Sequence, residues 1–264
     1  MKILISNDDG FGAAGITALT KELSKEHEVY VVAPDGERSA AGHSLTLHVP
    51  LRVTELPPKN GAVKNWKTSG TPGDCVKLAI REILGKDEKP DIVISGINHG
   101  PNLGADILYS GTVSCAMEGA MMGFPSIAVS LNSMSFDDNS FDYAAKFVAH
   151  FLPKVKEINF PKRTILNINI PGVPEEDING VAITTLGTRM FTDEYEKRID
   201  PRGKAYYWMA GEQITDARND KNDINALHWN KISITPVTFE MTHRSIIPAL
   251  ENAFCKDGKC DWLP

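Results

Sequence analysis

The sequence lacks a long hydrophobic run, an excess of basic charge and the residue pattern of a signal peptide at its first residues. No run of about 18 apolar residues is present, so we expect no transmembrane helix. The 34 acidic residues outnumber the 28 lysines and arginines, and the net charge of -6 argues against a nucleic-acid polymer as partner. The N-terminus shows no basic region, apolar core or cleavage site of a signal peptide, so a cytoplasmic location is expected.

Cysteine is also scarce, and the four cysteines fall into two pairs. Cys75 and Cys115 lie in apolar, helix-like surroundings, and we expect both to be reduced core residues. Cys255 and Cys260 lie close together near the C-terminus and could form a small disulfide loop or bind a metal with outside help. Because the expected compartment is reducing and no further Cys or His partners lie nearby, we expect free thiols there.

Alternating strand and helix patterns predict an α/β fold. Residues 2–6 have the pattern of a buried strand, Ala13 to Lys25 that of an amphipathic helix, and Glu28 to Ala33 that of a second strand. This strand–helix–strand start predicts a parallel sheet with right-handed crossovers. Further strands are expected at 45–49, 51–56, 91–96, 126–131 and 163–170, and helices at 71–84, 110–122 and 143–152.

The character of the chain changes at about residue 175. The remainder is more polar, with short β-like pieces and a final helical stretch near residues 245–253. We therefore expect a catalytic core over residues 1–174 and a smaller β-rich extension over residues 175–264. This extension would pack on the core and reach a partner subunit.

Two adjacent carboxylates, Asp8 and Asp9, end the first expected strand and are followed by glycine. In open α/β sheets, ligands bind outside the carboxyl ends of the strands. Two like charges side by side are costly unless a positive group lies beside them, and a divalent cation is the simplest candidate. One aspartate could cap the next helix, but the second needs its own explanation.

Further oxygen donors follow other expected strands at the same edge of the sheet. Ser39 lies in the loop after the second strand, and Asn98 lies in the loop after residues 91–96. Carboxylate, hydroxyl and amide oxygens suit a hard cation such as Mg²⁺, Mn²⁺ or Ca²⁺ rather than zinc. Turn serines and asparagines commonly bond only their own backbone, so each residue alone also fits a turn.

The start of the helix at 110–122 has the composition of an anion site. Ser110, Gly111 and Thr112 combine hydroxyls and a glycine where the helix exposes backbone N–H groups. A helix cap explains them equally well locally, but their position just after the Asn98 loop favours phosphate binding. A similar helix start at residues 71–74 is more typical of a cap alone. His43 and His99 lie in the same loops and are candidate acid–base groups.

A glycine-rich pattern also follows the acid pair. Residues 10–15 spell G-x-G-x-x-G between a strand and a helix, and Asp35 ends the next strand, which together resemble a dinucleotide-binding fingerprint. A pyrophosphate would have to rest on bare N–H groups beside Asp8 and Asp9, which is repulsive without a metal. We therefore expect a glycine-rich turn rather than an NAD(P) or FAD site.

Taken together, the motifs resemble those of the SurE (stationary-phase survival) nucleotidases over nearly the whole chain. They are Asn7-Asp8-Asp9-Gly10, Ala33-Pro34 with Arg38-Ser39, Ser69-Gly70-Thr71-Pro72, Ser95-Gly96-Ile97-Asn98-His99-Gly100, Tyr109-Ser110-Gly111-Thr112-Val113, Asp200-Pro201-Arg202-Gly203, Tyr206-Tyr207-Trp208, Thr215-Asp216 and Ser233-Ile234-Thr235-Pro236. The chain departs from the family pattern at Ala40, where we expect glycine, and in the long polar stretch at 217–225.

The resemblance implies a metal-dependent phosphatase that acts on nucleoside 5′- and 3′-monophosphates, with short polyphosphate as a further substrate in some members. It implies a Rossmann-like three-layer core with a mostly parallel sheet and a C-terminal extension that assembles a homodimer or homotetramer. It also implies one divalent metal, Mg²⁺ or Mn²⁺, per subunit. The implied metal ligands are Asp8, Asp9, Ser39 and Asn98.

The leading hypothesis is hydrolysis of a phosphate monoester by a metal-activated water. Asn98 and the N–H groups of residues 110–112 would hold phosphoryl oxygens, and either Asp8 or Asp9 could accept the proton of the water. A phosphoaspartyl phosphatase fits less well, because it requires Asp-x-Asp rather than adjacent acids. The non-enzymatic alternative is a receiver-like or nucleotide-sensing module, although the chain is about twice the length such a module needs.

Overall fold

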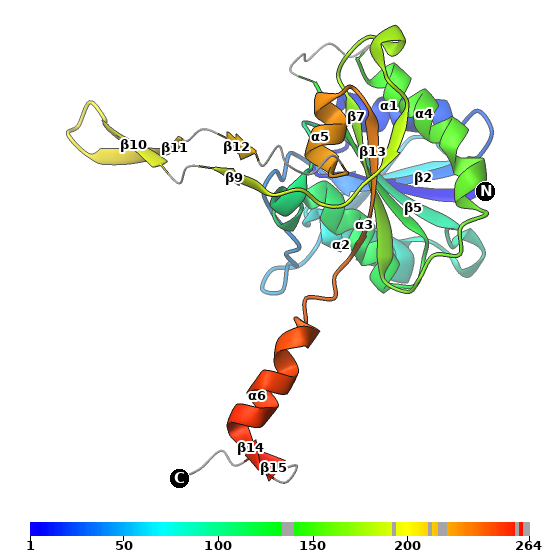
Figure 1. Cartoon of the computed structure of the whole chain (residues 1–264). Helices are drawn as coiled ribbons and strands as arrows, with labels where there is room; N and C mark the ends of the chain where they lie inside the picture. Colours follow the sequence, from blue (N-terminus) through cyan, green and yellow to red (C-terminus); the bar gives the residue numbers. More distant parts are fainter. Residues whose placement is uncertain (134–139, 192–193, 211–212, 216–220, 257–258, 261–264) are drawn as a thin grey trace.

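The computed structural model describes residues 1–133, 140–191, 194–210, 213–215, 221–256 and 259–260. A twisted nine-stranded sheet forms the centre of the molecule, with helices on both faces (Figure 1). In spatial order its strands are β3 (Val53–Leu56), β4 (Lys64–Thr68), β2 (Glu28–Pro34), β1 (Lys2–Ser6), β5 (Ile92–His99), β6 (Ser126–Asn132), β7 (Thr164–Pro171), β13 (Ile232–Thr238) and β8 (Val181–Ile183).

Most neighbouring strands are parallel, which confirms the predicted α/β fold. The five pairs from β4 to β7 are all parallel, whereas β3 and β13 run antiparallel to β4 and β7. The helices of the core are α1 (Ala14–Leu23), α2 (Pro72–Leu78), α3 (Gly111–Met121), α4 (Ser140–Val155) and the short α5 (Asp223–His228). Since β13 and β8 belong to the same sheet, the central sheet also uses residues beyond 174.

The alternation of side chains along β1 shows why this strand is apolar throughout. Ile3 and Ile5 pack in the core cluster with α1 and α4, whereas Leu4 packs in the cluster with α2 and α3. Successive side chains of a strand point to opposite faces, so a strand covered by helices on both sides is apolar at every position. β1 therefore lies at the centre of the three layers, and its carboxyl end opens at the middle of the sheet edge.

Residues 45–49 do not form the predicted strand. Leu47 and Val49 are exposed, and the backbone N–H of Thr46 donates to the carboxylate of Asp74 at 3.1 Å instead of to a neighbouring strand. The alternating apolar residues Leu45, Leu47 and Val49 therefore do not form the buried face of a strand. These residues belong to a long loop, residues 37–49, which we call the Ser39 loop.

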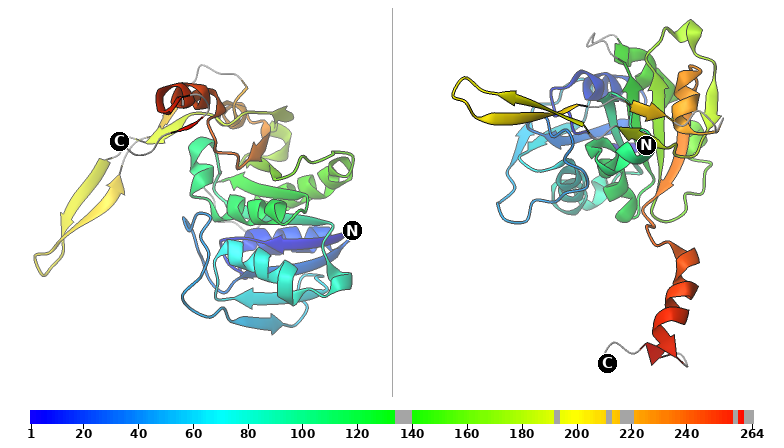
Figure 2. Two further views of the ribbon diagram at one scale, coloured as in Figure 1. Left: turned by 90° about the horizontal axis from the view of Figure 1, so that it is seen from below. Right: turned by 60° about the vertical axis from the view of Figure 1, so that its left-hand side comes forward.

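Two segments of the C-terminal part project away from the core (Figures 1 and 2). The first is the hairpin of β10 (Glu194–Ile199) and β11 (Ala205–Ala210), next to the short pair β9 (Arg189–Phe191) and β12 (Gln213–Thr215). The second is α6 (Ile247–Phe254), which is followed by β14 (Cys255–Lys256) and β15 (Lys259–Cys260). No helix in the described part of the chain is long and apolar enough to cross a membrane.

The cysteine predictions hold for one pair and fail for the other. Cys75 and Cys115 are buried and free, as expected. Cys255 is disulfide-bonded, which corrects the expectation of a free thiol. The register of β14 and β15 brings Cys255 opposite Cys260. The expectation of free thiols rested on the expected compartment, which contains no information on this pairing.

Candidate active site

Asp8 and Asp9 lie at the carboxyl end of β1, between the loops that follow β2 and β5. Asp8 is buried, and one of its carboxylate oxygens accepts a hydrogen bond from the hydroxyl of Thr112 at the start of α3. Burial raises the pKa of Asp8, although the Thr112 hydrogen bond acts in the opposite direction. Asp8 is therefore held by α3 in one orientation.

Asp9 is half-buried beside Asp8 and contacts the last residue of β5. One oxygen of its carboxylate accepts a hydrogen bond from the backbone N–H of His99 at 3.4 Å. Burial, and then the negative charge of Asp8, raise the pKa of Asp9 to about 6. Among the residues that the structure describes, no lysine or arginine forms an ion pair with either aspartate. The pair therefore concentrates negative charge that its described surroundings do not neutralise.

The N-terminus of α3 abuts Asp8. Ser110 is the N-cap, and its hydroxyl oxygen accepts a hydrogen bond from the N–H of Val113 at 3.0 Å. A Cβ at Gly111 would lie 2.5 Å from the Cβ of Asp8, so this helix can approach the aspartate only with glycine at that position. The positive end of the helix dipole thus faces the acid pair, and the backbone N–H groups of Gly111 and Thr112 donate to Asp8 and lower its pKa. A helix start with this geometry favours negative charge.

Ser39 lies in the loop after β2. Asn98 belongs to β5 itself, just beyond a register shift in the pairing with β6, which corrects the expectation that it lies in a loop. Both side chains make other contacts. The hydroxyl of Ser39 is exposed and donates to the carboxylate of Glu37 at 2.7 Å. The amide nitrogen of Asn98 donates to the carbonyl oxygen of Gly100 at 2.8 Å, so the ligand atom that this side chain can offer is its amide oxygen. The Ser39 loop is nevertheless attached to the acid pair, because the N–H of Arg38 donates to the carbonyl oxygen of Asp8 at 2.7 Å.

Two buried asparagine side chains of β7, which none of the sequence motifs includes, bind the backbone of Asn102 in the loop after β5. Asn102 donates its backbone N–H to the side-chain oxygen of Asn169 at 2.8 Å. Its carbonyl oxygen accepts from the amide groups of Asn167 and Asn169 at 2.9 and 3.0 Å. The signal for this contact is present in the sequence, because Asn167 and Asn169 alternate with isoleucine and leucine in a strand that is otherwise apolar.

Two glycines of the G-x-G-x-x-G pattern have structural explanations. Gly10 has a φ of +95°, which favours glycine in the turn after the acid pair. A Cβ at Gly15 would lie 1.9 Å from the carbonyl oxygen of Ile97, so glycine allows α1 to pack against β5. Two of the three glycines of the pattern are thus explained by the turn and by the packing of α1, and Gly12 has no structural requirement of this kind.

The donors at this edge of the sheet fit a hard cation better than zinc. The described residues contain no group of three or more His, Cys, Asp or Glu side chains that could hold a metal. The oxygen donors available are the carboxylates of Asp8 and Asp9, the hydroxyl of Ser39 in the loop after β2, and the amide oxygen of Asn98 in β5. Oxygen ligands are those that Mg²⁺, Mn²⁺ and Ca²⁺ prefer.

Comparison with known proteins finds relatives of a single family. The family model described as survival protein SurE matches residues 3–193. A 5′-nucleotidase SurE from Carboxydothermus hydrogenoformans is 49% identical over 262 residues, which cover 96% of this chain and 98% of the relative. Another from Thermosynechococcus vestitus is 49% identical over 249 residues, 92% of each chain. A crystal structure of a SurE protein from Aquifex aeolicus superimposes with a TM-score of 0.80 at 39% identity, covering 95% of this chain and 98% of the other.

Proposed function

The chain belongs to the SurE family of nucleotidases, and from this premise we propose that it hydrolyses nucleoside 5′- and 3′-monophosphates with one divalent cation, Mg²⁺ or Mn²⁺, per subunit. Short polyphosphate is a further proposed substrate. The observation that carries the proposal is the pair of buried Asp8 and half-buried Asp9 against the N-terminus of α3. An unneutralised acid pair beside an anion site can accept a cation and a phosphate together.

The proposed ligands of the cation are the carboxylates of Asp8 and Asp9, the hydroxyl of Ser39 and the amide oxygen of Asn98. A bound divalent cation supplies positive charge against a phosphoryl oxygen and lowers the pKa of a water molecule. Ser39 can keep its hydrogen bond to Glu37 in this role, because the lone pairs of the donating hydroxyl oxygen remain available to a cation. The proposed ligand set includes Ser39 only when the Ser39 loop holds this oxygen near the acid pair.

The protein's own groups would bind the phosphoryl oxygens, orient Asp8 and accept the proton of the water. Backbone N–H groups of Ser110, Gly111 and Thr112 bind the other phosphoryl oxygens and stabilise the charge that spreads over them during transfer. Thr112 keeps the Asp8 carboxylate in its orientation through the hydroxyl hydrogen bond. Either carboxylate of the pair can accept the proton that the attacking water loses.

Release of phosphate from a panel of nucleotides tests the proposal. We expect 5′- and 3′-monophosphates to release phosphate with Mn²⁺ or Mg²⁺, and a chelator to abolish the release because the acid pair then repels the phosphate. Excess cation added back after chelation is the control and should restore the rate. An equal rate in chelator and in Mn²⁺ would contradict metal dependence, and inert 3′-nucleotides would restrict the proposal to 5′-substrates.

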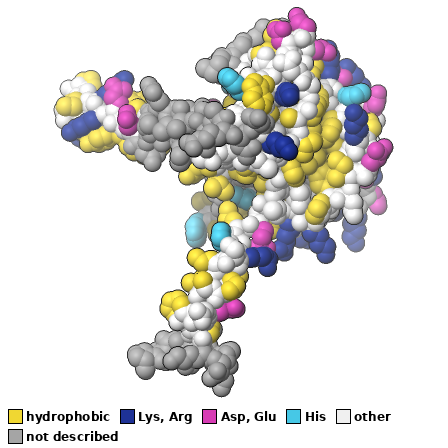
Figure 3. All heavy atoms as spheres, in the orientation of Figure 1, with side chains coloured by type: hydrophobic (Ala, Val, Ile, Leu, Met, Phe, Trp, Pro, Cys, Tyr) yellow, Lys and Arg dark blue, Asp and Glu magenta, His cyan; other side chains and the backbone are white. Residues whose placement is uncertain are grey.

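We further propose that the C-terminal extension assembles a homodimer or homotetramer. The hairpin of β10 and β11 exposes Tyr195, Trp208 and Met209, and α6 exposes Leu250 and Phe254 (Figure 3). Side chains of this size on two projecting segments leave apolar surface in water, and exposed patches of this kind mark interaction sites. A second copy of the chain is the partner that this extension would reach.

Sedimentation of the full chain and two charge variants tests the assembly. We expect a dimer or tetramer, and we expect Trp208→Glu or Phe254→Glu to shift it toward monomer because a charge would be buried at the interface. Ile158→Glu, at an exposed apolar position on the core, is the matched control and should leave the mass unchanged. A monomeric wild type at all concentrations would refute the proposal.

A further inference from the structure

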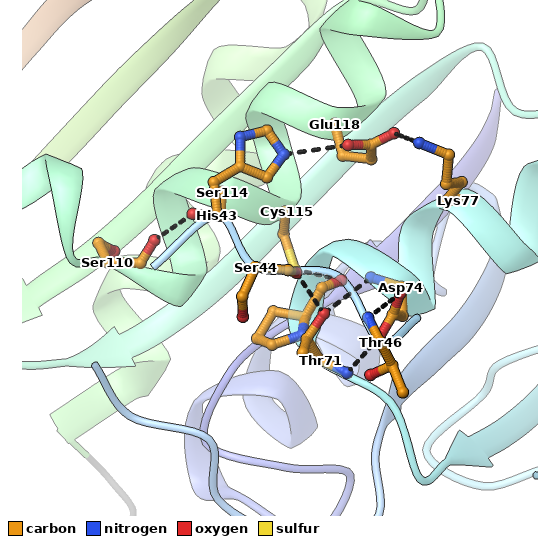
Figure 4. A network of polar contacts seen from close by, with 11 residues as sticks. His43, Ser44, Thr46, Thr71, Asp74, Lys77, Ser110, Ser114, Cys115 and Glu118 are labelled. Carbon is orange, nitrogen blue, oxygen red and sulfur yellow. Dashed lines mark hydrogen bonds and ion pairs between the residues drawn. The ribbon is translucent and has the colours of Figure 1, made fainter. Parts of the chain in front are cut away.

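We propose that His43, through its contact with Glu118, is a positioning residue that holds the Ser39 loop against α3 and so places Ser39 at the cation site. The inference rests on the proposed function for the role of Ser39. The contact itself joins residues 75 positions apart, with His43 Nε2 lying 3.0 Å from Glu118 Oε2 (Figure 4).

Glu118 is a charged side chain in an unusual place. Its side chain is only 3% exposed, and it lies in the second half of α3, away from the acid pair. The second carboxylate oxygen, Oε1, accepts from Lys77 Nζ of α2 at 2.9 Å, so both oxygens have partners. A buried carboxylate is costly unless it is fully paired, and here the pairing also joins α2, α3 and the Ser39 loop.

The hydrogen bond with His43 is the main reason why the pKa of Glu118 is below its ordinary value, and Lys77 acts in the same direction. Glu118 is therefore a carboxylate that can accept from the imidazole. The imidazole of His43 contacts Glu118 of α3 instead of Asp8 or Asp9. This contact favours a structural role for His43 over the acid–base role that its loop position suggested.

The Ser39 loop depends on such contacts because it contains no helix or strand of its own. Its backbone is attached at Arg38 to Asp8 and at Gly42 to the carbonyl oxygen of Tyr109, the latter at 3.0 Å. Farther along, the hydroxyl of Thr71 donates to the carbonyl oxygen of Ser44 at 2.7 Å, and Thr46 donates to Asp74. Ser39 lies between the first two attachments.

The position of His43 allows its contact with Glu118 to hold the segment that carries Ser39. It follows Gly42 directly, so its side chain extends the attachment at Tyr109 onto the body of α3. The same helix holds Asp8 through Thr112 at its N-terminal end. Helix α3 thus contacts both Asp8 and the segment that carries Ser39. The His43–Glu118 contact sets the distance between Asp8 and this segment.

The test compares His43→Ala with Lys77→Ala in the full chain. Each removes one partner of Glu118, but only His43 belongs to the Ser39 loop. Hydrogen exchange of peptides covering residues 37–49, without metal, and calorimetric titration with Mn²⁺ are the two measurements. We expect His43→Ala to exchange faster in this loop and to weaken Mn²⁺ binding about tenfold, the size of effect seen when outer partners of metal ligands are removed.

Lys77→Ala is expected to lower the thermal midpoint while loop exchange and Mn²⁺ affinity stay as in the wild type. His43→Gln should restore both readouts, because its amide nitrogen can occupy the place of the imidazole nitrogen. Activity should follow the same division: His43→Ala needs more Mn²⁺ for half-maximal rate but reaches a kcat within about twofold of wild type at saturation.

Wild-type exchange and wild-type Mn²⁺ affinity in His43→Ala would overturn the proposal. So would equal loosening of the loop in Lys77→Ala, which would make the contact a general support of the fold. A wild type that binds no Mn²⁺ would refute the proposed function instead, and loop exchange would still show whether His43 holds the loop.

Discussion

Asp8→Asn and Asp9→Asn variants will lose phosphate release by about a thousandfold, as expected when charge that acts on the transferring group is removed. Asparagine keeps the shape of the side chain, and in the Asp8 variant it can still accept the hydrogen bond from Thr112. The loss therefore reports the missing charge rather than a displaced loop. Initial rates in saturating Mn²⁺ and substrate are the measurement.

The Asp9→Asn variant should also be the more stable protein when no metal is present. The pKa of Asp9 is about 6 in the folded chain against an ordinary value of 3.8, so the folded state binds the proton more tightly. Below the ordinary value the carboxyl is protonated in both states and has no cost. Above about 6 it is ionised in both, and the folded state carries the full unfavourable energy of the charge.

We expect Asp9→Asn to raise the free energy of unfolding by about 1 to 2 kcal/mol near pH 8, a figure reduced because solvent screens the exposed part of this half-buried side chain. The gain should disappear toward about pH 4. Denaturation in chelator at both pH values measures it. A variant that is fully active in excess metal, or one that is less stable than wild type near pH 8, would exclude the assignment of Asp9 to a charged cation site.

The substitution Gly111→Ala should disable the site by a change in α3 instead of in the aspartates. In a helix, Gly→Ala ordinarily stabilises by about 1 kcal/mol, because alanine loses less backbone entropy. Here the new Cβ would lie 2.5 Å from the Cβ and 2.8 Å from Oδ2 of Asp8, so helix and aspartate must move apart. Overpacking of this kind costs about 1 to 3 kcal/mol, which outweighs the gain in propensity.

The expected outcome for Gly111→Ala is a loss of kcat/KM on the order of a hundredfold, since a displacement of about 1 Å in a catalytic group has that effect. Gly12→Ala is the matched control. Gly12 also lies in the glycine-rich segment after the acid pair, but a Cβ added there would have no other atom within 4 Å, and its backbone is not in the left-handed region. Equal activity of the two variants would show that α3 does not need to approach Asp8 closely.

Much of the fold could be predicted because its signals are local. Apolar strands covered on both faces and helices with one apolar stripe follow from side-chain period alone. Strands β1, β2, β5, β6 and β7 and helices α1 to α4 were found where expected. The helix start at Thr71 is a second example. Its hydroxyl and the carboxylate of Asp74 form the reciprocal capping box that their three-residue spacing indicates.

The errors share the opposite property. Residues 45–49 have the alternation of a strand but no partner edge, and Cys255 is paired although composition suggested a free thiol. The short α5 and the strand β4 were not predicted. Each of these features depends on which segments of the chain contact one another in the fold. The spacing of apolar residues along the sequence contains no information about such contacts.

The same division applies to the candidate site. By itself the sequence determined that two carboxylates end the central strand and that glycine and hydroxyl groups begin a helix, because both are properties of neighbouring residues. Only the tertiary structure decided that Gly111 lies against Asp8 and that Glu118 reaches His43. Those contacts depend on the order of strands in the sheet, which brings α3 across the end of β1 and determines which distant side chains it meets.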